Sequence, residues 1–417
     1  MKQYRVEARC LIFLVALLFS SPSFFSSEPS HSLKGLKWRN PRIVISLSRS
    51  LESSSNIHAA VDRAVERSLY SWSSPTTISF QLETSDAESV SPKGMRGDGI
   101  SLVTAATTPQ NLRLFPKQGD SPAAVTRIFK DSLGFITEAD IVLNPFVKFS
   151  ADGSFDTYDL QATLTHEIGH LLGLEHSPIW SSVMYERLSK SSGPAFFRKP
   201  RENLAQVDAS AIKALYGPSP YDVQCCGAVR GRLEANLVER RALIWVEEAE
   251  NGRLVAATMP EKDGSYHLEG VPEGDYLLRA LATGRDQYFA SVSSKIAVTV
   301  AETTIQNFDL RPARSDVEVQ LLGSSIQIAR QAADLRSLSS GLFLGVFGTP
   351  GSISSVRISG SDVGFEPSVT RPPSFASVRV VGFQPNGHLN LPEGEYTLVI
   401  TANNGVRQYL VGSLINY

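Results

Sequence analysis

Cysteine is scarce in this sequence, and its scarcity excludes two common ways of stabilising a protein. The chain of 417 residues has three cysteines, at Cys10, Cys225 and Cys226. Cys10 lies in an N-terminal segment that we expect to be removed, and a bridge between adjacent cysteines is strained. A disulfide framework is therefore excluded. Two neighbouring thiolates also cannot build the tetrahedral cage of a structural zinc site.

The sequence also lacks an excess of charge of either sign. Its 40 lysines and arginines nearly balance 42 aspartates and glutamates. This balance gives no indication of nucleic acid or an anionic membrane as a partner. Hydrophobic residues make up 42% and charged residues 20% of the chain, which is typical of soluble proteins with buried cores. The length suggests about three domains.

The longest apolar run is too short to cross a membrane. CLIFLVALLF occupies Cys10 to Phe19, whereas a spanning helix needs about 20 apolar residues. A basic start (MKQYRVEAR) precedes this run, and a serine-rich stretch follows it. That order is typical of a secretory signal peptide. We expect residues 1–27 to be a signal peptide and short leader, and the mature chain to be secreted, extracellular or periplasmic, without a membrane span.

The rest of the chain divides into three regions of different pattern. Residues 34–218 mix alternating strands, such as Pro41 to Ser48, with amphipathic helices, such as His58 to Trp72 and Leu204 to Tyr216. In residues 223–312 and 315–417, short β-rich runs alternate with turns. We predict a multidomain protein with one α+β domain followed by two all-β sandwiches. Two similar motifs in the β-rich regions, PEGDYLL (272–278) and PEGEYTL (392–398), each predict a tight turn that leads into a strand.

Three of the seven histidines lie in the short stretch HEIGHLLGLEH, from His166 to His176. We predict a helix from Tyr158 to Leu172, in which the apolar residues share one face. His166 and His170 share the opposite face, about 6 Å apart along the axis. A continuous helix would carry His176 about 15 Å beyond His166. Gly173 accepts the left-handed conformation that ends helices, so the chain can fold back and bring His176 to the same ion.

This arrangement suits zinc. Three protein ligands and one open position define a catalytic rather than a structural zinc site. Glu167, beside the first histidine, can reach a water at the open position and remove its proton. The sequence therefore predicts one catalytic Zn²⁺ held by His166, His170 and His176, with Glu167 as general base and then general acid. A bare HExxH occurs by chance in unrelated helices, but five fixed positions, glycine included, argue against an accident.

The extended motif HExxHxxGxxH resembles that of the metzincin zinc proteases. Ser177, directly after the third histidine, resembles the matrixin (matrix metalloprotease-like) branch, and Met184 in SSVMYE resembles the methionine turn beneath the zinc. Upstream, ITEADIVLN resembles the edge strand that binds substrate, which implies an exposed edge at Ala139 to Asn144. The resemblance covers about Leu36 to Gly217. It implies an α/β/α fold with a mixed twisted sheet and a zinc helix, and an endopeptidase acting on proteins or peptides.

Several features of the matrixin pattern are missing. No cysteine lies between the leader and Trp38, so a propeptide that caps the zinc is not expected. No histidine lies in residues 144–157, so the second, structural zinc is not expected. Asp152, Asp156 and Asp159 are candidate calcium ligands, but capping of the helix by Asp156 or Thr157 explains them without an ion, and nothing else supports calcium. Phe196 and Phe197 are candidates to line the pocket after the cut bond, with a polar connection as the alternative.

The two C-terminal regions show no catalytic constellation. Residues 223–312 resemble a prealbumin-like (carboxypeptidase regulatory-like) module, and residues 315–417 resemble an immunoglobulin-like or IPT-type sandwich. We expect them to dock the protein to a matrix, a cell surface or a substrate. The leading interpretation is a secreted zinc endopeptidase. The alternatives are a non-catalytic adhesion or scaffold protein with a vestigial protease domain, and hydrolysis of another amide such as a peptidoglycan cross-link.

Overall fold

A computed structural model provides the structure of the protein. It describes residues 36–53, 60–92, 97–115, 122–186, 188, 190, 204–222, 225–235, 241–284, 288–322, 332–336, 342–348, 353–367, 379–386 and 390–416. The predicted signal peptide (1–27) and the pair Phe196 and Phe197 lie outside these residues. Within the described part of the chain, no helix has both the length and the apolar character needed to cross a membrane.

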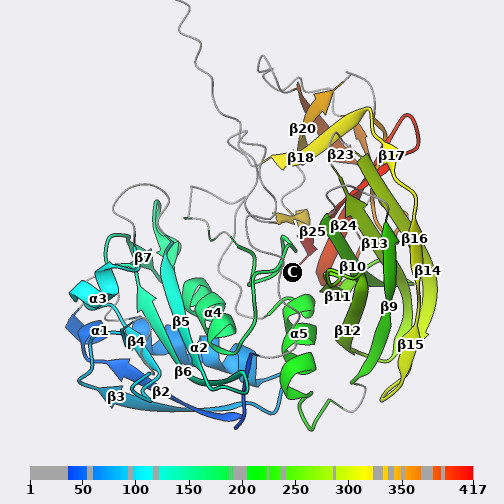
Figure 1. The fold of residues 1–417 in the computed structure, drawn as a ribbon. Coiled ribbons are helices and arrows are strands. Elements are labelled where there is room, and N and C mark those ends of the chain that lie inside the picture. The colour runs from blue at the N-terminus through cyan, green and yellow to red at the C-terminus, as the bar shows by residue number, and fades with distance from the viewer. Residues whose placement is uncertain are drawn as a thin grey trace, which may run out of the picture.

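The N-terminal part is built on a mixed sheet of six strands (Figure 1). The path runs β1-β6-β4-β2-β3, with all neighbours parallel, and β5 pairs with β6 in antiparallel fashion. The strands are β1 (Lys37–Trp38), β2 (Arg42–Ser48), β3 (Ser79–Ser85), β4 (Leu102–Thr104), β5 (Ala124–Lys130) and β6 (Phe135–Leu143). The expected mixed sheet is therefore present in this part of the chain.

The position of the edge strand differs from the prediction. Residues 139–143 lie in β6, which pairs with β5 on one side and with β1 and β4 on the other. Ile141 and Val142 are fully buried there. The prediction of an exposed edge at Ala139 to Asn144 is wrong, because β6 is paired along both of its sides and is therefore an interior strand. The strand at this edge of the sheet is β5, and β3 lies at the opposite edge.

Two helices, α2 and α4, pack together and share one core with this sheet. Trp72 on α2 is fully buried and donates its Nε1–H to the carbonyl of Thr165 on α4 at 2.8 Å. The predicted helices at 58–72 and 204–216 are confirmed to within a few residues. The helices are α1 (Ser50–Ser53), α2 (Val61–Ser73), α3 (Pro109–Leu112), α4 (Leu160–Leu171) and α5 (Gln206–Tyr216), and a small pair of strands, β7 (Phe149–Ser150) and β8 (Tyr158–Asp159), precedes α4.

The second region consists of two sheets that contribute to one core. One sheet has the order β11-β10-β13-β14-β17, and the other has the order β12-β9-β15, with β16 also pairing β9. The prealbumin-like assignment and the domain boundaries stay predictions. The strands are β9 (Gly227–Ala235), β10 (Arg241–Glu248), β11 (Leu254–Thr258), β12 (Ser265–Val271), β13 (Gly274–Thr283), β14 (Tyr288–Val298), β15 (Thr303–Ile305), β16 (Phe308–Leu310) and β17 (Ala313–Arg314).

The third region forms one continuous sheet in the order β18-β20-β23-β22-β21-β24-β25-β19. Its immunoglobulin-like assignment also stays a prediction. The strands are β18 (Val317–Leu322), β19 (Ala333–Asp334), β20 (Leu342–Gly348), β21 (Ile353–Ile358), β22 (Gly364–Pro367), β23 (Arg379–Pro385), β24 (Gly394–Ala402) and β25 (Arg407–Asn416).

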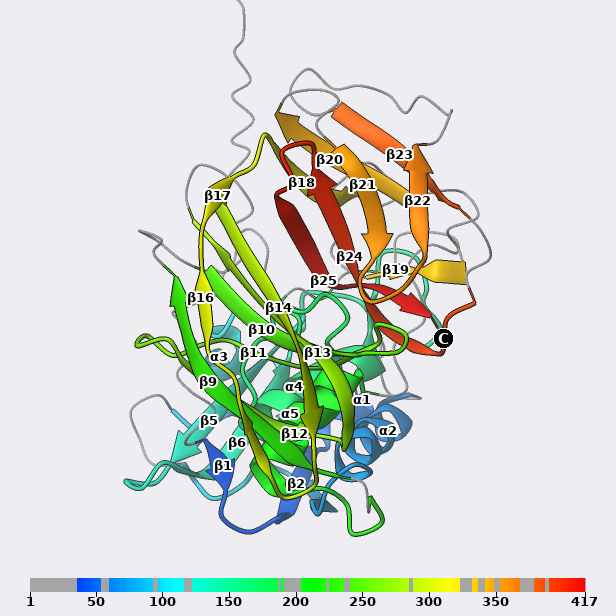
Figure 2. The same cartoon turned by 90° about the vertical axis from the view of Figure 1, so that its right-hand side faces the viewer.

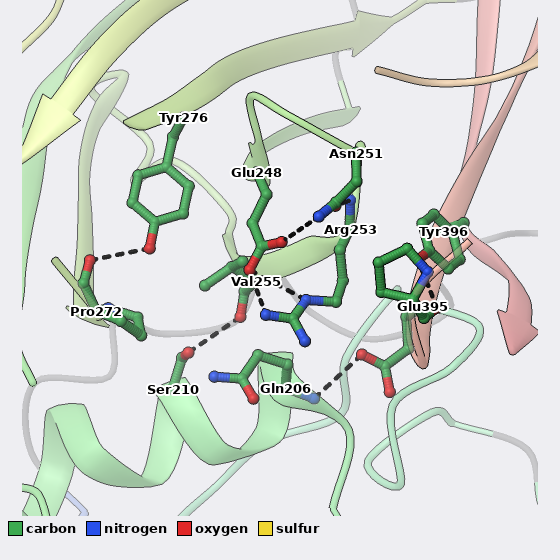
Figure 3. A network of polar contacts seen from close by, with 11 residues as sticks. Gln206, Ser210, Glu248, Asn251, Arg253, Val255, Pro272, Tyr276, Glu395 and Tyr396 are labelled. Carbon is green, nitrogen blue, oxygen red and sulfur yellow. Dashed lines mark hydrogen bonds and ion pairs between the residues drawn. The ribbon is translucent and has the colours of Figure 1, made fainter. Parts of the chain in front are cut away.

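The two similar sequence motifs adopt the same local structure. The Tyr276 hydroxyl donates to the Pro272 carbonyl at 3.0 Å, and the Tyr396 hydroxyl donates to the Pro392 carbonyl at 2.7 Å (Figure 3). The strands β13 and β24 begin at the glycine of each motif. The prediction of a turn that leads into a strand is confirmed at both places, and each tyrosine closes its turn.

Helix α5 stands between the N-terminal part and the β-rich parts (Figure 1), and the two β-rich regions lie next to each other (Figure 2). The Ser210 hydroxyl of α5 donates to the Val255 carbonyl of β11 at 3.0 Å. After α5, a disulfide joins the adjacent Cys225 and Cys226. It links no distant segments, and within the described residues there is no disulfide framework.

Candidate metal centre

The first two histidines are presented by α4, whose apolar face is anchored in the core. Leu164, Ile168 and Leu171 are buried there. The helix begins after Asp159, whose carboxylate accepts the backbone N–H of Ala162 at 2.8 Å. The predicted capping by Asp156 or Thr157 is therefore wrong. Tyr158 and Asp159 belong to the small strand β8, so the helix begins at Leu160, two residues later than predicted.

The chain reverses direction at Gly173, directly after α4. Gly173 has φ +97°. Its N–H donates to the His170 carbonyl at 2.8 Å, and the N–H of Leu174 donates to the Gly169 carbonyl at 3.0 Å. This pair of bonds is the Schellman arrangement that satisfies the last carbonyls of a helix. Because the helix stops here, His176 does not continue along its axis.

The reversal places the three histidines around one point. The rings of His166 and His170 have centroids 4.8 Å apart, and the His176 ring lies 5.3 Å and 4.7 Å from them. One nitrogen from each ring can be chosen so that all three lie within 4.8 Å of one another. Among the residues that the structure describes, this is the only cluster of histidine, cysteine or carboxylate side chains with spacing suited to a metal.

The outer nitrogens of the two helix histidines are held by carbonyl groups. His166 Nδ1 lies 2.7 Å from the Val183 carbonyl, and His170 Nδ1 lies 2.8 Å from the Leu174 carbonyl. A carbonyl only accepts, so each Nδ1 carries the proton, and in a neutral ring the Nε2 lone pair is free. The two Nε2 atoms are 3.2 Å apart. Two lone pairs at this distance repel unless a cation lies between them, so the donor set fits a metal ion.

The environment keeps these histidines neutral. Burial, reinforced by the neighbouring imidazoles, lowers the pKa of His166 and of His170 to about 4. Burial also lowers the pKa of His176, opposed by the charge of Glu186. Neutral imidazole is the form that binds a metal. At neutral pH the site therefore presents three lone pairs without a need to remove protons.

Glu167 is buried beside these rings, where it receives a hydrogen bond from Thr126. The Thr126 hydroxyl lies 2.6 Å from Glu167 Oε2 and 3.0 Å from the Glu167 carbonyl oxygen. Burial raises the pKa of the Glu167 carboxyl, while His170 and the bond from Thr126 lower it. Thr126 lies on the edge strand β5. Sequence reasoning missed it, because no motif or spacing connects β5 to α4.

Met184 packs directly beneath α4. It is buried, and a Cβ added to Gly169 would lie 2.2 Å from its sulfur. The backbone of the same turn bonds to the histidine loop, because Ser177 donates its N–H to the Met184 carbonyl at 2.8 Å. Asp208 on α5 accepts the Val183 N–H at 2.8 Å and the Ser182 hydroxyl. The turn that supports His166 is therefore held by helix α5.

The three aspartates considered for calcium have other partners. Asp152 accepts from the backbone and hydroxyl of Ser154, and Asp156 pairs with Lys190 at 2.9 Å. Asp159 caps α4. These partners account for the aspartates without an ion, except that the buried Oδ2 of Asp159 has no hydrogen-bond partner among the described residues, and a calcium role stays untested.

Comparison with known proteins agrees with this geometry. Residues 124–217 match the matrixin family. The chain is 27% identical to metalloendoproteinase 1-MMP of Arabidopsis thaliana over 208 residues, which cover 48% of this chain and 47% of the relative. It is 27% identical to the interstitial collagenase of Oryctolagus cuniculus over 169 residues (40% and 31%) and 28% identical to human matrix metalloproteinase-20 over 192 residues (44% and 32%).

The matched segments thus span between about a third and about half of these relatives. At the level of the family they support a zinc metalloendopeptidase. The matrixin family binds zinc, and among the described residues the three convergent histidines form a group that could hold such a metal. The chain therefore carries a matrixin-like catalytic domain.

Proposed function

We propose that this protein is a secreted zinc-dependent endopeptidase. His166, His170 and His176 hold a single Zn²⁺, and Glu167 is the general base. The observation that carries the proposal is the approach of the two Nε2 lone pairs to 3.2 Å while both Nδ1 atoms are engaged with carbonyls. A bound zinc ion would lower the pKa of a water and polarise the scissile carbonyl.

Glu167 supplies the proton transfers in this mechanism. Its raised pKa brings the carboxylate closer to the range in which it exchanges protons near neutrality. The carboxylate takes a proton from the attacking water, whose oxygen forms a bond to the carbonyl carbon. It then gives this proton to the amine that leaves when the C–N bond breaks. The bond from Thr126 holds the carboxylate in one rotamer for both transfers.

The substrate binds as an extended chain along β5. This strand pairs with β6 on one side only, and within the described residues no strand pairs its other side. A peptide added there would form main-chain hydrogen bonds that do not depend on its sequence. β5 also carries Thr126, so such a peptide would pass close to Glu167. The substrates are accordingly proteins or peptides, and the C-terminal modules dock the enzyme to a matrix, a cell surface or the substrate itself.

The test compares the full chain with Glu167→Ala and with Glu83→Ala, a control on β3 away from the site. Zinc content is measured by mass spectrometry, and cleavage is measured on a mixed peptide library. We expect one zinc per chain in all three proteins and a loss of cleavage of about 100-fold or more in Glu167→Ala alone. Zinc without cleavage in the parent would favour the scaffold interpretation. A parent that takes up no zinc would refute the proposed function.

A further inference from the structure

The middle of the segment between His176 and Met184, residues 179–182, is buried, and its apolar side chains pack against the C-terminal modules. Ile179 is 1% exposed and Trp180 is 6% exposed. Ile179 lies in a cluster with Leu243, Trp245 and Leu254 of the second region and Val411 of the third. Trp180 belongs to the core of the third region itself. A loop of the catalytic domain thus completes the core of a module more than a hundred residues away in the chain.

Strand β25 is in direct contact with this loop. The N–H of Trp180 donates to the Val411 carbonyl at 3.4 Å. Gly412, the next residue, has φ +65°, and a Cβ there would lie 2.5 Å from Ile179 Cγ2 and 2.7 Å from Ser181 Oγ. A side chain at this position would therefore require Ile179 or Ser181 to move. Any displacement of β25 toward the loop is therefore transmitted to residues 179–181.

The same loop leads directly to a group that orients a metal ligand. Ser182 and Val183 follow, and the Val183 carbonyl accepts His166 Nδ1 at 2.7 Å. At the other end of the loop, Ser177 directly follows His176. Groups that hold the outer nitrogen of a ligating histidine fix the direction of its metal-binding nitrogen. β25 is thus separated from the imidazole of His166 only by a short, buried run of residues.

The modules are fixed in place by a polar junction at α5 (Figure 3). The Gln206 N–H, in the first turn of α5, donates to Glu395 Oε2 of the third region at 3.3 Å. The second region contacts the same helix through the hydrogen bond from Ser210 to the Val255 carbonyl. Arg253 of the second region pairs with Glu248 and forms a β-bridge to Tyr396 of the third region. Three parts of the chain therefore meet at one helix. Buried apolar contacts and paired polar groups join the three parts at this helix.

We propose that strand β25 of the C-terminal module positions the metal centre through residues 179–183. Val411 and Gly412 are positioning residues, which act on the site through the loop and make no contact with metal or substrate. The inference rests on the proposed zinc site. It gives the third region a role inside the catalytic unit, in addition to any role in docking.

The chain offers two matched pairs of variants for the test. Gly412→Ala introduces the clash with the loop, whereas Gly405→Ala, at φ +83° in the turn before β25, has no atom within 4 Å of the new Cβ. Val411→Ala removes an interface contact, whereas Val346→Ala removes a similarly buried valine from the core of the same module. Gly405→Ala makes the same change without a contact to residues 179–181. Val346 lies in the cluster that contains Trp180, but outside the cluster in which Val411 packs with Ile179, so its replacement leaves that second contact intact.

The experiment uses the full chain and measures the Zn²⁺ dissociation constant by competition with a chelator. The visible spectrum of the Co²⁺-substituted protein reports the ligand geometry independently of activity. We expect Gly412→Ala and Val411→Ala to weaken Zn²⁺ binding about ten-fold or more and to alter the Co²⁺ spectrum, while the controls behave like the parent.

The outcomes separate the two proposals. If the parent binds zinc and all four variants bind it equally, the positioning role is wrong and the proposed function stands. If the parent binds no zinc, the proposed function fails and this inference fails with it. Should Gly412→Ala not fold, the comparison of Val411→Ala with Val346→Ala decides the question. Equal weakening by these two variants would show general destabilisation and overturn the inference.

Discussion

Replacing Gly173 by alanine tests the backbone reversal on which the histidine cluster depends. Gly173 has φ +97°, and an added Cβ would lie 1.9 Å from the Leu36 carbonyl oxygen and 2.8 Å from its carbon. Both are backbone atoms, so a simple side-chain rotation cannot relieve the contact. Either the first residues of the domain or the turn after α4 must move.

The expected loss has two parts. A non-glycine residue held at positive φ costs about 1–3 kcal/mol. Forcing extra volume into a packed site costs about another 1–3 kcal/mol. Gly217→Ala provides the control, because Gly217 also ends a helix at positive φ, +79°, but has no atom within 4 Å of a new Cβ. We therefore expect Gly173→Ala to lower the free energy of unfolding by about 1–3 kcal/mol more than Gly217→Ala does.

The assay is urea unfolding of the metal-free proteins, followed by titration with Zn²⁺. Gly173→Ala should show the lower midpoint and the weaker zinc binding, because the same turn carries His176 toward the other two ligands. Equal midpoints and unchanged zinc affinity in both variants would refute the reasoning, since they would mean that the reversal tolerates a Cβ and that the cluster does not depend on it.

Three further predictions concern the same centre. Burial lowers the pKa of the two α4 histidines to about 4 from an ordinary value of 6.5. The unfolded chain therefore takes up protons below about pH 6.5 while the folded chain does not, so the metal-free protein should lose stability between about pH 6.5 and 4. Its urea midpoint should fall across this window, and more steeply than that of His170→Gln. Thr126→Val should lower kcat about ten-fold or more with little change in KM, because it removes the hydrogen bond to the carboxylate of Glu167. Thr126→Ser keeps the hydroxyl and should have the kcat of the parent. If the valine variant also had the kcat of the parent, this hydrogen bond would not contribute to catalysis. Gly169→Ala should lower the free energy of unfolding by about 1 kcal/mol. Its Cβ would lie 2.2 Å from Met184 Sδ and 2.9 Å from the rigid ring of Trp72, which costs about 1–3 kcal/mol, and the higher helix propensity of alanine offsets about 1 kcal/mol of this. Thermal unfolding with an unchanged midpoint would contradict this close packing.

Helix α4 and its end could be predicted because the relevant interactions are local. Apolar residues at helical spacing place Leu164 and Ile168 in the core, and the structure buries both. The glycine after the helix takes a positive φ. Each of these features follows from the conformational preferences of neighbouring residues, so a single sequence contains the information.

The errors arose where a pattern had two solutions. The apolar run in residues 139–144 reads equally well as an edge or an interior strand, and only the pairing with β5 shows that it is interior. Candidate caps occur at Asp156, Thr157 and Asp159, and the short strand β8 determines that Asp159 is used. The residues of β5 and β8 do not indicate which segments these strands pair with.

One short stretch of residues was enough to predict the donor groups of the site: three imidazoles and one carboxylate at a spacing that a helix and a glycine turn can bring together. What surrounds these groups depends on the packing of distant segments. This packing brings Thr126 to Glu167, Asp208 to the turn below His166, and β25 to the loop after His176. These contacts join segments far apart in the chain, and they depend on how whole sheets and helices pack. The hydrophobic periodicity of a single segment therefore does not predict these contacts.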